Sequence, residues 1–195
     1  MSEILNTNGG NGRVSIALLE GSRIIYINGP VTDDMAFHFN TMLLRLEHES
    51  SNEDIVVYIN SPGGSVPAGL SMIDTMNLVS CDVSTVCVGM AASMGAMLLM
   101  SGEKGKRKIL PHSKVLIHQP LQNLGDGFLQ AADIEIAAKE VLRTRETLYT
   151  IIHDVTGQPY EKIAKDCDRD YTLSAQEAFE YGLVDEIVVS HKKGR

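Results

Sequence analysis

Short runs of branched apolar residues alternate along this chain with longer stretches of helical periodicity. The short runs predict strands over residues 22–27, 54–59, 83–88, 114–118 and 186–189. Between them, apolar side chains at helical spacing predict helices over residues 33–49, 67–79, 94–101 and about 131–155, with shorter helices over 159–167 and 174–181. Strands that alternate with helices are typical of an α/β domain built on a largely parallel sheet.

The helix predicted over residues 131–155 is long for a compact chain of this size. Roughly 25 residues at 1.5 Å of rise each extend about 37 Å, whereas 195 compact residues have a radius of gyration of about 16 Å. We therefore expect this helix to extend beyond its own core. Its apolar stripe favours self-association, and packing within the subunit is the alternative. The stripe consists of Ile134, Ala138, Val141, Leu148, Ile152 and Val155.

Composition and charge exclude several classes of protein. With 44% hydrophobic and 22% charged residues, the 195-residue chain has the composition of one globular domain. A formal charge of −8 argues against a nucleic-acid surface, so the basic cluster over residues 104–108 is interpreted as a solvated turn. No apolar run reaches the roughly 20 residues of a membrane span, and the N-terminus resembles neither a signal peptide nor a transit peptide. Polar, glycine-rich residues 1–15 predict a mobile arm.

The three cysteines are odd in number and lack the spacing of a metal site. Cys81 and Cys87 are expected to be small core or sheet residues in a reducing compartment. The cytoplasm, or the equivalent reducing interior of an organelle, is the expected location.

A single hydroxyl interrupts the apolar run over residues 86–100. Ser93 follows strand-like residues and precedes the helix expected at 94–101, and small residues around it permit a sharp turn. Nucleophilic serines of elbow-type hydrolases occupy such turns, where backbone amides face the oxyanion. On this segment alone, a serine that only caps the helix is the commoner case.

Other parts of a hydrolytic site lie elsewhere in the chain. His118 ends a predicted strand, and ligands of parallel sheets gather at the carboxyl ends of strands, although a structural histidine is the alternative. Amides of the Gly63–Gly64 pair can approach a bound carbonyl closely, although the pair also suits an ordinary turn. The segment lacks the lysine of a phosphate-binding loop. Asp166, Asp168 and Asp170 are candidates to orient the histidine, and their spacing does not choose among them.

Six motifs follow one another between about residues 22 and 189. They are Tyr58-Ile-Asn-Ser-Pro-Gly-Gly64, Asp82-Val-Ser-Thr-Val86, Gly89-Met-Ala-Ala-Ser-Met-Gly-Ala96, Gly105-Lys-Arg107, Ile117-His-Gln-Pro-Leu121 and Glu180-Tyr-Gly-Leu-Val-Asp185. Together they resemble the ClpP family, the proteolytic subunits of ATP-dependent Clp proteases. The resemblance implies one crotonase-like peptidase domain over residues 1–195, a spiral of ββα units. It also implies an axial loop at the N-terminus and a protruding handle over about 125–157 that interlocks two seven-membered rings.

The same resemblance assigns roles in catalysis. It implies Ser93 as nucleophile, His118 as general base and Asp170 as orienting acid, with the amides of Gly64 and Met94 as the oxyanion hole. The implied activity is endopeptidase cleavage of unfolded polypeptides inside a double-ring chamber that an AAA+ Clp unfoldase supplies. No cofactor and no metal are expected, since ATP is used by the unfoldase.

Further positions are implied less directly, and some depart from the family pattern. Asp168 and Arg169 match a pair that bridges the ring interface. The segment after Leu121 is about three residues longer than usual. Two of the expected docking positions carry aliphatic side chains where the family has aromatic ones, which weakens an aromatic anchor site. The expected cleft residues are Gln122, Asn123, Leu124 and Gly125, and the expected unfoldase-docking residues are Val56, Tyr58 and Leu78.

These departures favour a divergent paralogue and leave its assembly open. A homo-oligomer of stacked heptameric rings is one possibility. A hetero-oligomer with a second ClpP-type subunit is another, in which this chain is latent or regulatory until the partner binds. A crotonase-type acyl-CoA enzyme is a third reading, disfavoured because such enzymes need no Ser-His-Asp set. Neither nucleic acid nor a membrane is an expected partner.

Overall fold

The computed structural model describes residues 8–9, 13–14, 16–19, 21–121 and 130–189. Its main sheet has eight strands in the order β10-β7-β6-β5-β4-β3, with β8 paired to β6 and β9 paired to β8. A separate pair joins β1 (Asn8–Gly9) to β2 (Arg13–Val14). The strands of the main sheet are β3 (Ile16–Leu18), β4 (Ile24–Asn28), β5 (Ile55–Ser61), β6 (Val83–Ala92), β7 (Arg107–Ile109), β8 (Lys114–Ile117), β9 (Tyr171–Ser174) and β10 (Glu186–Ile187).

The sheet is largely parallel, as the sequence predicts. β4, β5, β6, β7 and β10 run parallel, whereas β3 and β9 pair antiparallel with their neighbours. The long strand β6 changes partner along its length, because Thr85–Cys87 pair with β7 and Met90–Ala92 pair with β8. Gly89 lies between the two halves at a φ of 79°. The carboxyl end of β6, which precedes Ser93, is therefore held between β5 and β8.

Six helices accompany the strands in the described part of the chain. They are α1 (Asp33–Glu49), α2 (Val66–Leu78), α3 (Met94–Met100), α4 (Ala131–Thr156), α5 (Tyr160–Asp166) and α6 (Ala175–Tyr181). α1 begins where the sequence predicts, because the Thr32 hydroxyl accepts a hydrogen bond from Met35 N, and Asp33 and Asp34 occupy its first turn. All seven residues of α3 are buried, which explains why this helix carries no polar face.

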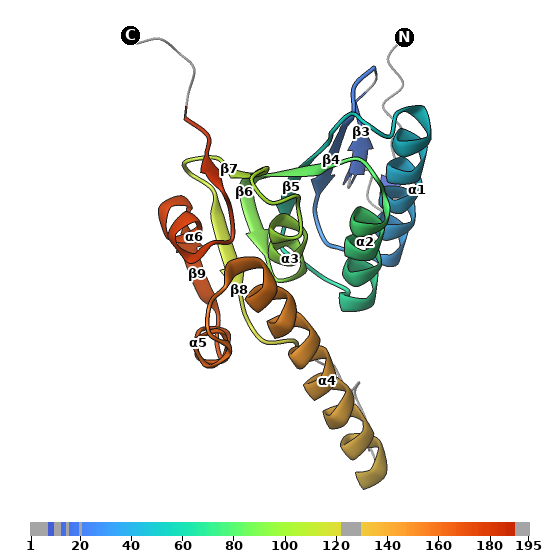
Figure 1. The fold of residues 1–195 in the computed structure, drawn as a ribbon. Helices are drawn as coiled ribbons and strands as arrows, with labels where there is room; N and C mark the ends of the chain where they lie inside the picture. Colours follow the sequence, from blue (N-terminus) through green and yellow to red (C-terminus); the bar gives the residue numbers. More distant parts are fainter. Residues whose placement is uncertain (1–7, 10–12, 15, 20, 122–129, 190–195) are drawn as a thin grey trace.

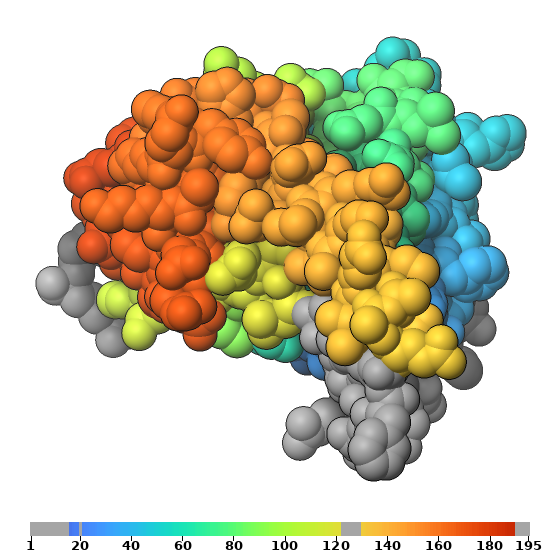
Figure 2. Space-filling view, turned by 90° about the horizontal axis from the view of Figure 1, so that it is seen from below, coloured from blue at the N-terminus to red at the C-terminus, as the bar shows by residue number. Residues whose placement is uncertain are grey.

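α4 leaves the body of the subunit, as its length predicts (Figure 1). Seen from below, it separates α5 and α6 from α1 and α2 (Figure 2). Leu148 and Ile152, near its carboxyl end, are buried against the core, whereas Ile134 and Ala138, near its start, are exposed. The predicted apolar stripe is thus used twice: one half packs within the subunit and the other half faces outward.

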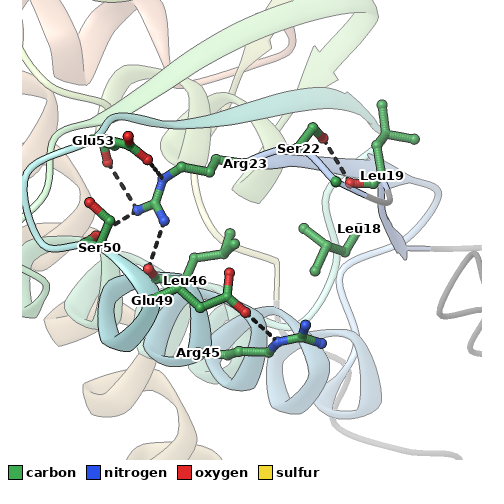
Figure 3. Close-up of a pocket in the computed structure, with 10 residues that line it drawn as sticks. Leu18, Leu19, Ser22, Arg23, Arg45, Leu46, Glu49, Ser50 and Glu53 are labelled. Carbon is green, nitrogen blue, oxygen red and sulfur yellow. Dashed lines mark hydrogen bonds and ion pairs between the residues drawn. The ribbon is translucent and has the colours of Figure 1, made fainter.

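Arg23 ties the end of α1 to β4 (Figure 3). Its Nη1 donates to Leu46 O at 2.7 Å, and its Nη2 donates to Ser50 O at 2.8 Å and to Glu53 O at 3.0 Å. These carbonyls lie in the last turn of α1 and beyond its end, and Leu46 O also accepts from Ser50 N at 3.0 Å. The carbonyls of a last helical turn that lack a partner within the helix need donors from outside it. A cavity of about 480 Å³ adjoins this arginine, and none of its lining residues lines the cavity beside Ser93.

The interpretation of residues 104–108 as a solvated turn is wrong at Arg107. This residue begins β7, and only 4% of its surface is exposed. Its Nε donates to Asp185 Oδ2 at 2.8 Å, and a second guanidinium nitrogen also contacts that carboxylate. The carboxylate neutralises the charge, and it lies 78 positions away in the sequence, so a local reading of the basic cluster does not find it.

Two other expectations concern whole segments. Cys81 and Cys87 are buried, as predicted, and so is Cys167. None of the helices in the described residues is long and apolar enough to cross a membrane.

Candidate active site

Ser93 occupies the turn between β6 and α3 in an unusual backbone conformation. Its φ of 54° and ψ of −122° make it the only non-glycine residue with a positive φ among the residues described. Such a conformation costs about 1–3 kcal/mol, and surrounding contacts must hold it. Ser93 stands at the N-cap position of α3, but its side chain makes no capping hydrogen bond. The simple capping role is therefore not observed, and within the described residues the hydroxyl makes no hydrogen bond that would keep it from chemistry.

Two neighbouring segments hold this turn in place. The Ser93 amide donates to Leu116 O of β8 at 2.8 Å. On the other side lies Gly63, at a φ of 87°, where an added Cβ would fall 2.6 Å from both Ala92 O and Ser93 Cβ. Only glycine allows the Gly63–Gly64 turn to approach the serine this closely.

Replacing Gly63 with alanine is expected to destabilise the subunit by more than 2 kcal/mol and to abolish most peptidase activity. The new methyl group would displace the Ser93 turn, and it would add to the cost of a positive φ. Gly105→Ala is the matched control, because Gly105 has the same φ of 87° with nothing within 4 Å of an added Cβ. We expect it to cost about 1 kcal/mol with activity retained. If urea unfolding showed the same loss of free energy of unfolding for both variants, the close approach of Gly63 to the Ser93 turn would be contradicted.

The two amides expected in the oxyanion hole are unoccupied donors. Val31 pairs with the Gly63–Gly64 turn through Val31 N to Gly63 O and Ser65 N to Val31 O, each at 2.9 Å, and this pattern leaves the Gly64 amide free. The Met94 amide belongs to the first turn of α3, which has no internal acceptor for it. In the described part of the chain neither amide donates a hydrogen bond, so both can bind an oxyanion.

Ser61 is a supporting residue that the sequence reasoning missed. Its buried hydroxyl donates to Gly29 O at 2.7 Å and accepts from Gly63 N at 3.1 Å, so it links β4 to the glycine turn. The available signal was alternation: residues 55, 57, 59 and 61 of β5 are all buried, and serine is the polar member of that series.

Ser93 and His118 line the same cavity, which has a volume of about 260 Å³. Most other lining side chains are apolar and come from α2, α3, α4 and the segment after β8, so the cavity can accept an apolar side chain of a substrate. They include Val66, Met97, Pro120, Leu148 and Ile152. No hydrogen bond joins the Ser93 hydroxyl to His118 in this structure, in which all three expected triad residues are described. Such bonds are often long without substrate.

The register of β8 and β9 distinguishes among the three candidate acids. Lys114 to Ile117 pair antiparallel with Ser174 to Tyr171, and the ladder ends at the pair of Ile117 and Tyr171. His118 directly follows this last pair and Asp170 directly precedes it, so of the three aspartates Asp170 is the one adjacent to the ladder. Asp170 is exposed and makes no hydrogen bond to His118 in the described residues.

The other two acids are placed differently. Asp166 Oδ2 accepts hydrogen bonds from Tyr181 Oη at 2.9 Å and from Lys162 Nζ at 2.6 Å, so its carboxylate is already used on α5. Asp168 is exposed, and its contact with the histidine strand is made by its backbone carbonyl. The register therefore favours Asp170, where spacing in the sequence left the choice open.

Cys87 and Cys167 are not alternative nucleophiles. Burial raises the pKa of the Cys87 thiol to about 12, and burial likewise raises the pKa of Cys167 to about 12. A thiol in this state carries almost no thiolate at neutral pH, and the thiolate is the reactive form. The described residues also hold no group of three or more His, Cys, Asp or Glu side chains placed to bind a metal ion.

The remaining predicted positions are only partly described. The expected cleft residues Gln122, Asn123, Leu124 and Gly125 lie outside the described residues. At the expected docking positions, Val56 and Tyr58 are half-buried, with Tyr58 stacked on Tyr26 at 6.0 Å, and Leu78 is 73% exposed. The side chains of Asp168 and Arg169, expected at a ring interface, are exposed. Their roles stay predictions.

Known proteins share much of this sequence. Residues 8–191 match the model of the Clp protease family. The chain is 52% identical over 170 residues to the ATP-dependent Clp protease proteolytic subunit 2 of Prochlorococcus marinus (strain NATL2A), which covers 87% of this chain and 84% of that protein. It is 53% identical over 169 residues to the ATP-dependent Clp protease proteolytic subunit 3 of Synechococcus sp. (strain CC9605), with 87% and 83% covered. The crotonase-like fold and the resemblance seen in the motifs are confirmed, and the chain belongs to the Clp protease family of serine peptidases.

Proposed function

We propose that this chain is an endopeptidase subunit that cleaves unfolded polypeptides with Ser93 as its nucleophile. The observation that carries the proposal is the strained backbone of Ser93 and its uncapped hydroxyl, in a cavity that His118 also lines. Strained non-glycine residues cluster at active sites. Family membership supports the same activity, and both relatives are named as proteolytic subunits.

The chemistry follows from the positions of five groups. His118 takes the proton of Ser93 as the hydroxyl oxygen attacks the scissile carbonyl carbon. The amides of Gly64 and Met94 donate to the oxyanion that forms, and one such donor is worth about 3–4 kcal/mol of barrier. His118 then gives its proton to the leaving amine, and water releases the acyl group by the same steps. Asp170 would hold the imidazole in the correct tautomer and stabilise its cationic form.

This mechanism needs no cofactor in the chain itself. ATP would be hydrolysed by a separate AAA+ Clp unfoldase, which would deliver the unfolded polypeptide. The buried, unpaired cysteines support a reducing location such as the cytoplasm.

A ring assembly is supported by the exposed half of α4. Ile134 is 48% exposed, Ile136 is 66% exposed and Leu142 is 46% exposed, on a helix that leaves the subunit body. Apolar side chains on a projecting helix favour burial against another subunit. We propose that this half of α4 forms the contact between two stacked heptameric rings.

A second candidate is a hetero-oligomer in which this chain works with another ClpP-type subunit. The supporting observation is that the two relatives carry the subunit numbers 2 and 3 in their names. The altered docking positions, Val56 and Leu78, agree with a subunit that relies on its partner for unfoldase contact.

Covalent labelling tests the nucleophile directly. A fluorophosphonate probe is expected to add to Ser93 in the assembled protein, as measured by peptide mass spectrometry, and the Ser93→Ala protein is expected to remain unlabelled. Ser71→Ala is a matched control, since that hydroxyl bonds within α2. Labelling that persists in Ser93→Ala would remove Ser93 from the proposal.

Native mass and peptidase activity, measured on one sample, separate the two assemblies. A tetradecamer of this chain alone that cleaves short peptides supports the homo-oligomer. A smaller, inactive species that gains activity when mixed with a second ClpP-type subunit supports the hetero-oligomer.

A further inference from the structure

The segment that carries Asp170 has few contacts of its own. It lies between the end of α5 at Asp166 and the start of β9 at Tyr171, beside β8 (Figure 1). Cys167 is fully buried and caps α5 through its amide, whose acceptor is Ile163 O at 2.8 Å. Residues 168–170 that follow are exposed. Something other than burial must therefore hold them beside the end of β8.

Gln119, the residue after His118, supplies two hydrogen bonds to this segment. Its backbone amide donates to Cys167 O at 2.7 Å, and its side-chain Nε2 donates to Asp168 O at 2.8 Å. Asp168 O also accepts from the guanidinium of Arg169, but that bond is between adjacent residues and does not reach β8. In the described residues, the Gln119 side chain makes the one side-chain hydrogen bond from the histidine strand to residues 168–170.

We infer that Gln119 is a positioning residue that holds the Asp170 segment beside His118. This inference rests on the proposed roles of His118 and Asp170. The carbonyl of Asp168 can only accept, so the NH₂ group of the Gln119 amide must face it. Without that donor, the exposed residues 168–170 lose their side-chain hydrogen bond to the residue after His118. A displacement of about 1 Å at a catalytic group can lower the rate about 100-fold.

Two substitutions of similar size separate hydrogen bonding from packing. Gln119→Met keeps the length of the side chain and removes the donor. Gln119→Glu keeps its shape but places a carboxylate oxygen against the Asp168 carbonyl, which repels it. We expect kcat for a short peptide to fall roughly tenfold in Gln119→Met and further in Gln119→Glu, with KM within twofold of the wild-type value. Gln176→Met is the matched control, since its amide bonds only Glu180 on the surface of α6.

A double-mutant cycle with Asp170→Asn tests whether Gln119 acts through the acid. If it does, Gln119→Met changes kcat less than twofold once Asp170→Asn is present. An unchanged kcat in both Gln119 variants would overturn the inference. The inference would also fail if Gln119→Met lowered kcat by the same factor with Asp170 and with Asn at position 170. It would fail as well if the fall in kcat matched a fall in the fraction of Ser93 sites that react with the fluorophosphonate. If Asp170→Asn itself leaves kcat unchanged, the proposed triad fails, and that result is distinct from failure of the Gln119 inference.

Discussion

Ser93→Ala is expected to lower kcat/KM for peptide cleavage by a factor of roughly 10⁴ or more. Among the described residues that line the cavity with His118, Ser93 carries the one hydroxyl, and its replacement leaves in place the amides of Gly64 and Met94 that are proposed to bind the oxyanion. Whatever activity remains would come from those donors and from substrate binding. The measurement is cleavage of a fluorogenic peptide by assembled protein, with native mass determined on the same sample.

Because the fold is kept, loss of activity in Ser93→Ala should occur without loss of assembly. Alanine occupies the same strained backbone conformation, and the Ser93 side chain makes no hydrogen bond that α3 needs. An Ser93→Ala protein that still cleaves peptide within tenfold of wild type would contradict the assignment. An Ser93→Ala protein that fails to assemble would instead give the serine a structural role.

The strain at position 93 adds a consequence for stability. Glycine adopts a φ of 54° without the steric cost that alanine bears, at some expense in the entropy of the unfolded chain. Ser93→Gly is therefore expected to exceed Ser93→Ala in free energy of unfolding by about 1 kcal/mol. Urea unfolding of both proteins at equal concentration measures this difference. It would identify the conformation of Ser93 as strain kept for function rather than for stability.

The sequence predicts the elements best where local signals agree. α1 is predicted from residue 33 to residue 49, and the structure has the same bounds, because its cap, its acidic first turn and its apolar spacing all coincide. The sequence does not predict the edge strand β3. The strands β7 and β9 are also missed, since basic residues begin one and an acidic stretch precedes the other. Both form because neighbouring strands supply partners that are distant in the sequence.

The site shows the same division between local and long-range information. A serine at a strand-to-helix junction is visible in the sequence, whereas its positive φ and free hydroxyl are not. Spacing leaves three aspartates as candidates, and only the pairing of β8 with β9 shows that Asp170 directly precedes the strand that pairs with the histidine strand. The family motifs also imply Asp170, because related proteins keep the same contacts between distant segments, whereas the spacing of apolar residues carries no information about such contacts.

The largest expected loss of stability comes from the buried ion pair between Arg107 and Asp185. The carboxylate contacts the Arg107 guanidinium and also accepts backbone hydrogen bonds from Gly105 N at 2.8 Å and Arg107 N at 3.0 Å. The side chains are only 5% and 19% exposed. Asp185→Ala would leave a buried guanidinium without its partner, which typically costs about 3–5 kcal/mol.

An exposed pair made by the next residue on each side provides the control. Lys108 Nζ lies 3.1 Å from Glu186 Oε2, with the two side chains 37% and 53% exposed. Glu186→Ala is expected to cost less than about 1 kcal/mol, because water screens this pair. Urea unfolding of both variants at neutral pH measures the contrast, and similar losses would show that burial of the Arg107 pair contributes nothing. Replacing Arg107 with methionine and Asp185 with leucine together should recover much of the loss.

The same pair makes stability depend on pH in a defined direction. Burial disfavours the charged form of Asp185, but hydrogen bonds from Arg107 and from the Gly105 amide outweigh it and lower the pKa of the carboxyl in the folded state. The stabilisation is therefore complete above the unfolded pKa, about 3.9, and is lost as the pH falls through the lower folded value. The difference in free energy of unfolding between the wild type and Asp185→Ala should stay constant from pH 7 to about pH 5 and become smaller below about pH 4. If this difference became larger in acid, the Asp185 carboxyl would be protonated more readily in the folded state than in the unfolded state. Its four hydrogen-bond donors require the reverse.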